Sequence, residues 1–85
     1  MEESAHVDRT LDCKGLSCPM PIIQTKKAIE AMLVGEVLEV LATDPGSVAD
    51  MKSWATRTQH EFLGTVTEGA VYRHFIRKGQ KESAT

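Results

Sequence analysis

Hydrophobic and polar positions follow two different periods along this chain of 85 residues. Short apolar or alternating segments predict strands over 7–12, 36–43, 60–67 and 70–78. A helical period predicts one helix over 19–33, ended by Gly35, and a second from about 47 to 58. Ser47 with Asp50 fits a capping box for the second helix, and Asp44 is the alternative cap.

The order β-α-β-α-β-β favours an α+β fold with two layers. Right-handed crossovers predict a four-stranded mixed sheet with both helices on one face. The length corresponds to one domain over 1–85, with 1–6 and 80–85 expected to be disordered tails. The positions expected to face the interior are Ile22, Ile29, Met32 and Leu33, then Val48, Met51 and Ala55 flanked by Trp54, then Phe62 and Val66, and finally Tyr72, His74 and Ile76.

The charge balance excludes some classes of function. With 10 basic and 12 acidic residues the net charge is −2, which gives no case for direct binding of nucleic acid. The richest apolar stretch, Val37 to Ala42, is short and contains Glu39, so no membrane span is expected. The first residues are polar and acidic, unlike a signal peptide, and a cytoplasmic location is expected.

Cys18 is the residue whose context points most clearly to chemistry. It follows Gly-Leu-Ser and precedes Pro-Met-Pro at the start of the first predicted helix. With Cys18 as the N-cap, Pro19 takes the first helical position, and Pro21 lies in the first turn. The prolines lack N–H groups, so those of Met20 and Ile22 are the expected donors to a thiolate. The helix dipole favours the same charge, and we expect a thiol pKa below the free value of about 8.5.

The sequence gives weaker support for a base, a second thiol or a metal acting together with this thiol. No spacing brings His6, His60 or His74 to Cys18 as a general base. Cys13 is a packing residue or a second thiol, and its spacing from Cys18 is not Cys-x-x-Cys. The chain lacks paired ligand clusters, so neither a metal nor a cofactor is expected. A lone reactive thiol suits a sulfur carrier, whereas a redox-sensitive regulatory or partner-binding module and a Cys13/Cys18 thiol-disulfide protein remain open.

Three basic residues lie close to Cys18 in the sequence: Lys14, Lys26 and Lys27. They form either a contact surface for an anionic group or an acidic partner, or an ordinary solvated helix face. Met20, between the prolines, is expected to be exposed, where it either joins a docking patch or fills a gap.

The Cys-Pro-x-Pro element after Gly-Leu, with Ala-Thr-Asp-Pro-Gly-Ser at 42–47 and Ile-Arg-Lys at 76–78, resembles TusA/SirA-type sulfur carrier proteins. The resemblance covers about 10–79. It implies the fold above and a persulfide on Cys18. It also implies a cysteine desulfurase or rhodanese-like protein as sulfur donor, and a downstream acceptor protein. Cys13 departs from the family pattern, and we expect a monomer when the carrier is free.

Overall fold

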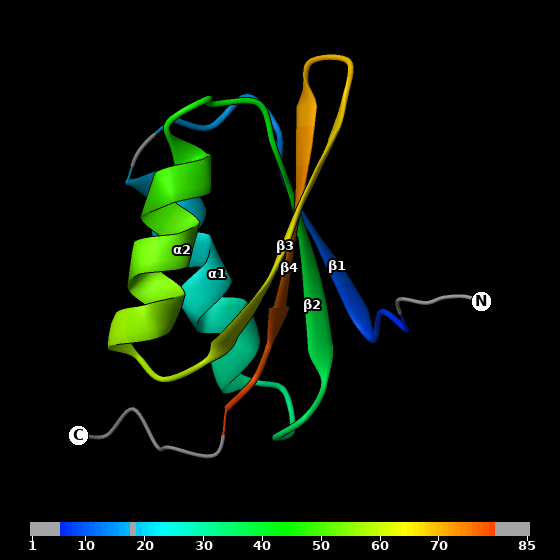
Figure 1. The fold of residues 1–85 in the computed structure, drawn as a ribbon, viewed down its shortest axis with the longest axis vertical. Coiled ribbons are helices and arrows are strands. Elements are labelled where there is room, and N and C mark those ends of the chain that lie inside the picture. The colour runs from blue at the N-terminus through cyan, green and yellow to red at the C-terminus, as the bar shows by residue number, and fades with distance from the viewer. Residues whose placement is uncertain (1–5, 18, 80–85) are drawn as a thin grey trace.

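A computed structural model describes residues 6–17 and 19–79, which form a four-stranded sheet with two helices on one face (Figure 1). The elements are β1 Arg9–Cys13, α1 Met20–Glu30, β2 Val37–Ala42, α2 Ser47–Arg57, β3 Glu61–Glu68 and β4 Val71–Arg77. Their order and layers confirm the predicted α+β fold, and the strands lie within two residues of the predicted ranges. The predicted tails fall outside the described residues, except for His6.

The sheet has the strand order β1-β2-β4-β3. β1 runs parallel to β2, whereas β4 is antiparallel to both β2 and β3. The two helical connections, β1 to β2 and β2 to β3, therefore cross the sheet in the same direction. Since such crossovers are right-handed, both helices cover the same face, and both begin at the edge where β1 and β2 end (Figure 1).

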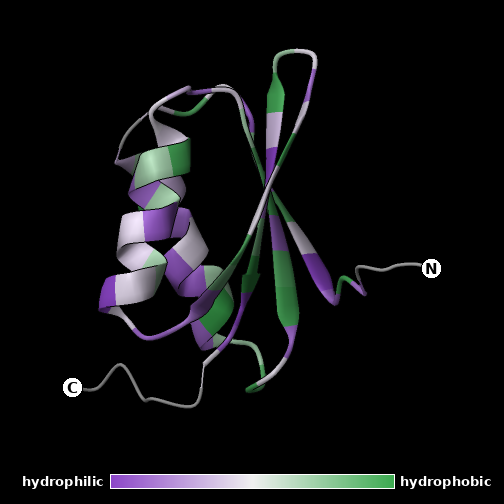
Figure 2. Cartoon of the chain, viewed as in Figure 1, coloured by the Kyte–Doolittle hydropathy of each residue, from purple (hydrophilic) through white to green (hydrophobic). Residues whose placement is uncertain are grey.

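The hydrophobic core lies between the helices and this covered face. β2 is largely hydrophobic (Figure 2), and its covered-face residues Leu38, Val40 and Ala42 are fully buried. The helices contribute the buried side chains of Ile29, Met51, Trp54 and Ala55, and Met32 adds another just after the end of α1. Most of the predicted interior positions are thus confirmed.

His74 on β4 is a polar residue inside this core. Its ring is fully buried, with Nε2 2.8 Å from Ser47 Oγ and Nδ1 2.9 Å from Thr65 Oγ1. A neutral imidazole donates from one nitrogen and accepts at the other, so both contacts can be satisfied together. The ring therefore links α2, β3 and β4, and the prediction that His74 faces the helices is confirmed.

The predicted capping box at Ser47 is wrong. Gly46 is the N-cap of α2, and the Ser47 hydroxyl is used by His74 instead. Asp44 instead accepts two backbone hydrogen bonds at the start of α2. Its Oδ1 accepts the Gly46 N–H at 3.1 Å, and its carbonyl accepts the Ser47 N–H at 2.9 Å. The alternative cap at Asp44 is closer to the structure.

The first helix is shorter than predicted. α1 ends at Glu30, after which two N–H groups bond to carbonyls three residues earlier and tighten the last turn. The Leu33 N–H then donates to Glu36 Oε1 at 2.8 Å, within the turn that contains Gly35. Leu33 is consequently 72% exposed rather than buried.

β3 contains a bulge that reverses the prediction for Val66. Phe62 pairs with Ile76 and packs against the core, but the register shifts between Phe62 and Gly64. Gly64 has φ of 140°, which favours glycine. One extra residue moves every later side chain to the other face of the strand. Val66 thus lies opposite Arg73 and is 44% exposed.

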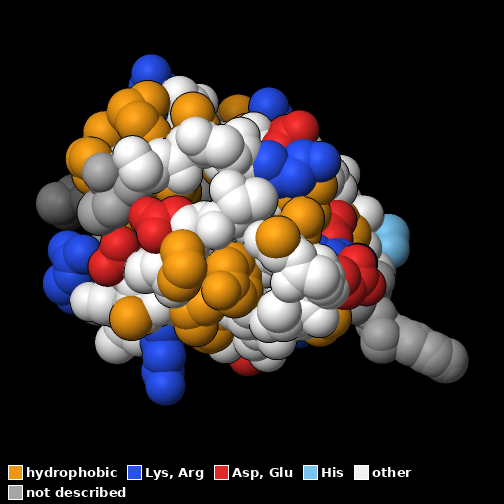
Figure 3. Space-filling model, turned by 90° about the horizontal axis from the view of Figure 1, so that it is seen from above, with side chains coloured by type: hydrophobic (Ala, Val, Ile, Leu, Met, Phe, Trp, Pro, Cys, Tyr) orange, Lys and Arg blue, Asp and Glu red, His pale blue; other side chains and the backbone are white. Residues whose placement is uncertain are grey.

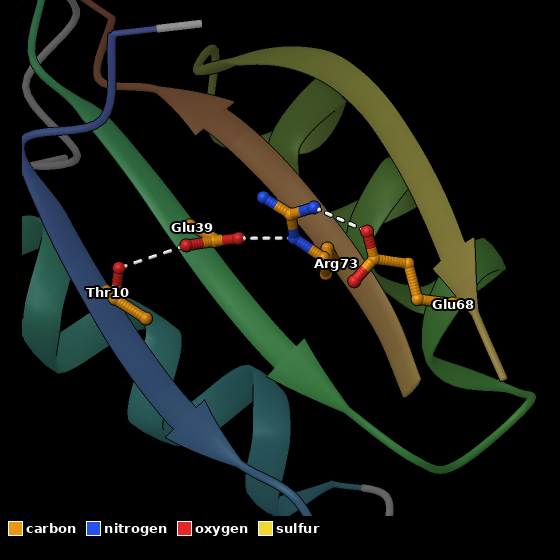
Figure 4. A network of polar contacts seen from close by, with 4 residues as sticks. All are labelled: Thr10, Glu39, Glu68 and Arg73. Carbon is orange, nitrogen blue, oxygen red and sulfur yellow. Dashed lines mark hydrogen bonds and ion pairs between the residues drawn. The ribbon is translucent and has the colours of Figure 1, made fainter. Parts of the chain in front are cut away.

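A polar network crosses the uncovered face of the sheet with one residue from each strand (Figure 4). Glu39 of β2 accepts hydrogen bonds from Thr10 Oγ1 at 3.0 Å and from Arg73 Nε at 2.6 Å. The Arg73 guanidinium also donates to Glu68 at 2.9 Å. The carboxylate of Glu39 is nearly buried, and its charge is balanced by the Arg73 guanidinium.

This network predicts unequal effects of removing two arginines from the same face of β4. Arg73→Met leaves Glu39 without its cation and should lower the free energy of unfolding by about 2 kcal/mol. Arg77→Met removes only the exposed pair with Glu61 and should cost less than about 0.5 kcal/mol. Urea unfolding followed by Trp54 fluorescence measures both, and equal effects would contradict the assigned role of the network.

The buried histidines predict a loss of stability in weak acid. Burial lowers the pKa of His74 below its ordinary 6.5. Burial, together with the charge of Lys78, lowers that of His60. The unfolded chain then binds more protons than the native one. The free energy of unfolding is therefore highest above about pH 6.5 and falls as the pH drops below that value. Urea unfolding at pH 7.5 and 5.0 should show the loss, and NMR titration of the imidazoles should place both pKa values below 6.5. A His74 ring that titrates at or above 6.5 would refute the assignment.

Candidate functional site

The candidate site lies at the edge of the sheet where β1 and β2 end and both helices begin. Cys13 and Ala42, the last residues of β1 and β2, are partners in the parallel register. The segment that leads to α1 therefore leaves the sheet beside the segment that leads to α2. Seen from this end, hydrophobic side chains gather on the surface with Lys and Arg side chains nearby (Figure 3).

Hydrogen bonds fix the segment between β1 and Cys18. The Lys14 N–H donates to Asp12 Oδ1 at 3.0 Å, and the Leu16 N–H donates to the Cys13 carbonyl at 3.1 Å. Gly15 has φ of 83°, a left-handed conformation that glycine adopts without strain. The Leu16 side chain packs against the core. A tight turn thus sets the direction in which the chain approaches the helix.

The start of α1 differs in one important bond from the prediction. Pro19 is the N-cap and the helix begins at Met20, one residue later than expected. The Met20 N–H donates to the Ser17 carbonyl at 2.9 Å, because the backbone closes a turn over three residues here. Met20 is therefore not the free donor that its spacing predicted. Cys18 lies outside the described residues, so a bond between it and the Ile22 N–H stays a prediction.

The side chains that follow Cys18 divide between the core and the surface. Pro21 is fully buried and Ile22 packs against the core, which anchors the first turn of α1 to the sheet. Met20 and Ile23 are 38% and 40% exposed, as expected for Met20. Two hydrophobic side chains are thus presented to the solvent at the start of the helix.

The three lysines predicted near the site are all exposed, and two of them lie on α1. Lys27 follows Ile23 by four residues and Met20 by seven, so the three side chains share one stripe of the helix. Lys26 is 3.9 Å from Glu30, a weak ion pair between exposed groups. Lys14 lies in the turn after β1. The outer side of α1 therefore combines apolar and basic groups.

Cys13 differs from a reactive thiol in its surroundings. It is 0% exposed and belongs to the hydrophobic core. Burial raises its pKa above the ordinary value, and the negative charge of Asp12 raises it further. A thiol of this kind stays protonated and packs as a small apolar group, which supports the packing role.

The described histidines are engaged in other contacts. Both ring nitrogens of His74 are hydrogen bonded, and His60 accepts the Gly79 N–H at Nδ1 with a distance of 3.0 Å. His6 lies 2.7 Å from Asp8 on the surface. Within 6–17 and 19–79, no group of three or more potential ligands is arranged to hold a metal ion.

A hollow of about 680 Å³ lies at the other end of the helices. It is lined by the turn after α1, the last part of α2 and the end of β4, including Val34, Thr56 and Lys78. None of the predicted site residues lines it.

In the part of the chain that the structure describes, no helix has the length and hydrophobicity needed to cross a membrane.

Sequence reasoning missed the contacts that Thr43 and His74 make near the start of the helices. The side chain of Thr43 accepts a hydrogen bond from Gly15, and the ring of His74 holds Ser47 at the start of α2. The alternation of β4 placed His74 on the covered face, but no spacing indicated its partner 27 residues away.

Comparisons with known proteins agree with this architecture. Over residues 9–78 the chain matches the family model described as "Sulfurtransferase TusA". The sulfur carrier protein TusA of Allochromatium vinosum is 45% identical over 74 residues, which are 87% of this chain and 97% of that protein. YrkF of Bacillus subtilis, described as a candidate sulfur carrier protein, is 57% identical over 74 residues. The match covers 87% of this chain but only 40% of YrkF.

A solved structure has the same fold. The crystal structure of a SirA-like protein from Desulfitobacterium hafniense superposes with a TM-score of 0.74 and 27% sequence identity. The alignment covers 85% of this chain and 99% of that one. Together, the family match over residues 9–78 and the common fold show that this chain belongs to the TusA family of sulfurtransferases.

Proposed function

We propose that this protein is a sulfur carrier that accepts sulfur as a persulfide on Cys18 and passes it to an acceptor protein. The observation that carries the proposal is the position of Cys18 within a TusA family match, directly before the two prolines that open α1. The first turn of a helix favours a negative charge placed before it. A thiolate, and the persulfide formed on it, both bear that charge.

In the proposed transfer one sulfur–sulfur bond breaks as another forms. The Cys18 thiolate attacks the outer sulfur of the donor's persulfide, the donor's S–S bond breaks, and the donor cysteine leaves as a thiolate. The outer sulfur is then bonded to Cys18. In the next step a thiolate of the acceptor protein attacks this outer sulfur, the S–S bond to Cys18 breaks, and Cys18 leaves as a thiolate. Atoms and charge balance without an external oxidant or reductant.

The burial of Cys13 supports a carrier over a dithiol protein. A resolving thiol has to reach its partner as a thiolate, but Cys13 is inaccessible and its pKa is raised by burial. The engaged histidine rings support the same choice, because a carrier takes its chemistry from its partners rather than from a base of its own.

The outer side of α1 supports a contact with an acidic donor. Met20, Ile23 and Lys27 share one stripe, Lys26 lies beside it, and Lys14 is exposed in the turn before Cys18. Apolar side chains flanked by lysines complement a partner surface with apolar and acidic groups. We infer a cysteine desulfurase or rhodanese-like protein as donor. The cytoplasm is the proposed location, since free thiols persist in a reducing compartment.

Cys18→Ser should abolish sulfur uptake, whereas Cys13→Ala should retain it. Incubation with a cysteine desulfurase and cysteine, followed by intact mass spectrometry, should show one added sulfur atom on the wild-type chain and on Cys13→Ala. Uptake that survives in Cys18→Ser would refute the proposal. Loss of two hydrogens under mild oxidation, without sulfur uptake, would instead indicate the Cys13/Cys18 dithiol.

Reversing two charges on α1 should slow the loading step. The variant Lys26→Glu/Lys27→Glu is expected to load about tenfold more slowly at low salt, because repulsion replaces attraction during encounter. The difference should shrink as salt rises. Lys52→Glu/Arg57→Glu reverses two exposed basic residues of α2, away from the candidate site, and is the matched control because it changes the net charge by the same amount. Equal rates for the two variants would place the donor contact elsewhere.

A further inference from the structure

The hydroxyl of Thr43 joins the two segments that leave the sheet at the candidate site. Thr43 follows the last residue of β2 and is half-buried. Its Oγ1 accepts a hydrogen bond from the Gly15 N–H at 3.0 Å. The two residues are 28 positions apart in the sequence, so this contact is tertiary.

Between described residues, the other hydrogen bonds of the Gly15 turn are local. Lys14 bonds to Asp12, and Leu16 bonds to Cys13, so both bonds join the turn to the end of β1. Local bonds of this kind give the turn its shape but do not fix its place relative to β2. The contact with Thr43 supplies that second point of attachment.

Threonine suits this position for a physical reason. Its branched Cβ restricts χ1, so the hydroxyl is held in one direction with little loss of entropy. Gly15 has φ of 83° and nothing within 4 Å of the position that a Cβ would occupy. Gly15 is therefore open on its outer side, and the packing of the neighbouring Leu16 side chain against the core is the other contact that holds the turn.

We propose that Thr43 is a positioning residue for sulfur transfer: its hydroxyl fixes the turn at Gly15, and through it the direction in which Cys18 is presented at the start of α1. This inference rests on the proposed function of Cys18. Thr43 does not touch the transferred sulfur in this scheme. Its effect is on the fraction of molecules whose thiol is correctly oriented for attack.

The test compares variants in a Cys13→Ala background, so that Cys18 is the one thiol. Thr43→Val keeps the shape and removes the acceptor, whereas Thr43→Ser keeps the hydroxyl. Thr58→Val is the control, since it removes a hydroxyl that donates to the Trp54 carbonyl at 2.7 Å, at the other end of α2. The readouts are sulfur loading by a cysteine desulfurase with cysteine, and the rate of alkylation by iodoacetamide against pH.

We expect Thr43→Val to accept sulfur about fivefold more slowly, because the loss of one neutral hydrogen bond lowers the population of the correct orientation by about that factor. Its alkylation profile should also move toward that of a free thiol, and Thr43→Ser should restore both readouts. Thr58→Val should be less stable yet load at the wild-type rate. Thr43→Ala removes the same hydroxyl with a smaller side chain, and it provides the comparison if the valine variant does not fold.

Two results would overturn the inference. Wild-type loading and alkylation in both Thr43→Val and Thr43→Ala, with loading still abolished in Cys18→Ser, would reject the role of Thr43 and leave the carrier function intact. Loading that persists in Cys18→Ser would reject both, because the thiol that Thr43 is proposed to position would not be the acceptor.

Discussion

The parallel pairing of β1 with β2 is the constraint on which the rest of the structure depends. Parallel neighbours cannot be joined by a tight turn, so the chain between them has to cross one face of the sheet, and α1 makes that crossing. The register that sets Cys13 opposite Ala42 ends both strands at one edge. Gly15 and Thr43 are thereby brought within hydrogen-bond distance. The position of the candidate site thus depends on the strand topology more than on any one side chain.

The described residues form a firm support with little catalytic chemistry of their own. The His74 ring is occupied by Ser47 and Thr65, and Cys13 is inside the core. On the uncovered face, the polar network of Thr10, Glu39, Arg73 and Glu68 is hydrogen bonded across all four strands (Figure 4). The exposed apolar and basic side chains on the outer side of α1 are then available for contact with partners. This division suits a protein whose partners supply the reactive steps.

Periodicity was sufficient to predict the elements, their order and the layers, because each depends on which positions are apolar. It failed where a single side chain chose between two partners. The Ser47 hydroxyl could cap α2 or bond to a strand of the sheet. It bonds to His74, which lies 27 residues away in the sequence. Val66 lies on the other face because a bulge adds one residue, and the isolated Gly64 within the strand pattern was the signal that could have indicated it. At the candidate site, the motif pointed to Cys18, which stays a prediction, but the turn that engages Met20 depends on backbone angles that spacing does not encode.

The same bulge has a consequence for how the molecule behaves among other copies of itself. β3 lies at the edge of the sheet, where a straight strand would offer a regular row of free N–H and C=O groups to another chain. The extra residue between Phe62 and Gly64 interrupts the spacing of that row, and Glu61 and Glu68 place charge at the ends of the strand. Pairing of another chain with β3 is therefore discouraged, which leaves β1 as the edge strand with an uninterrupted register.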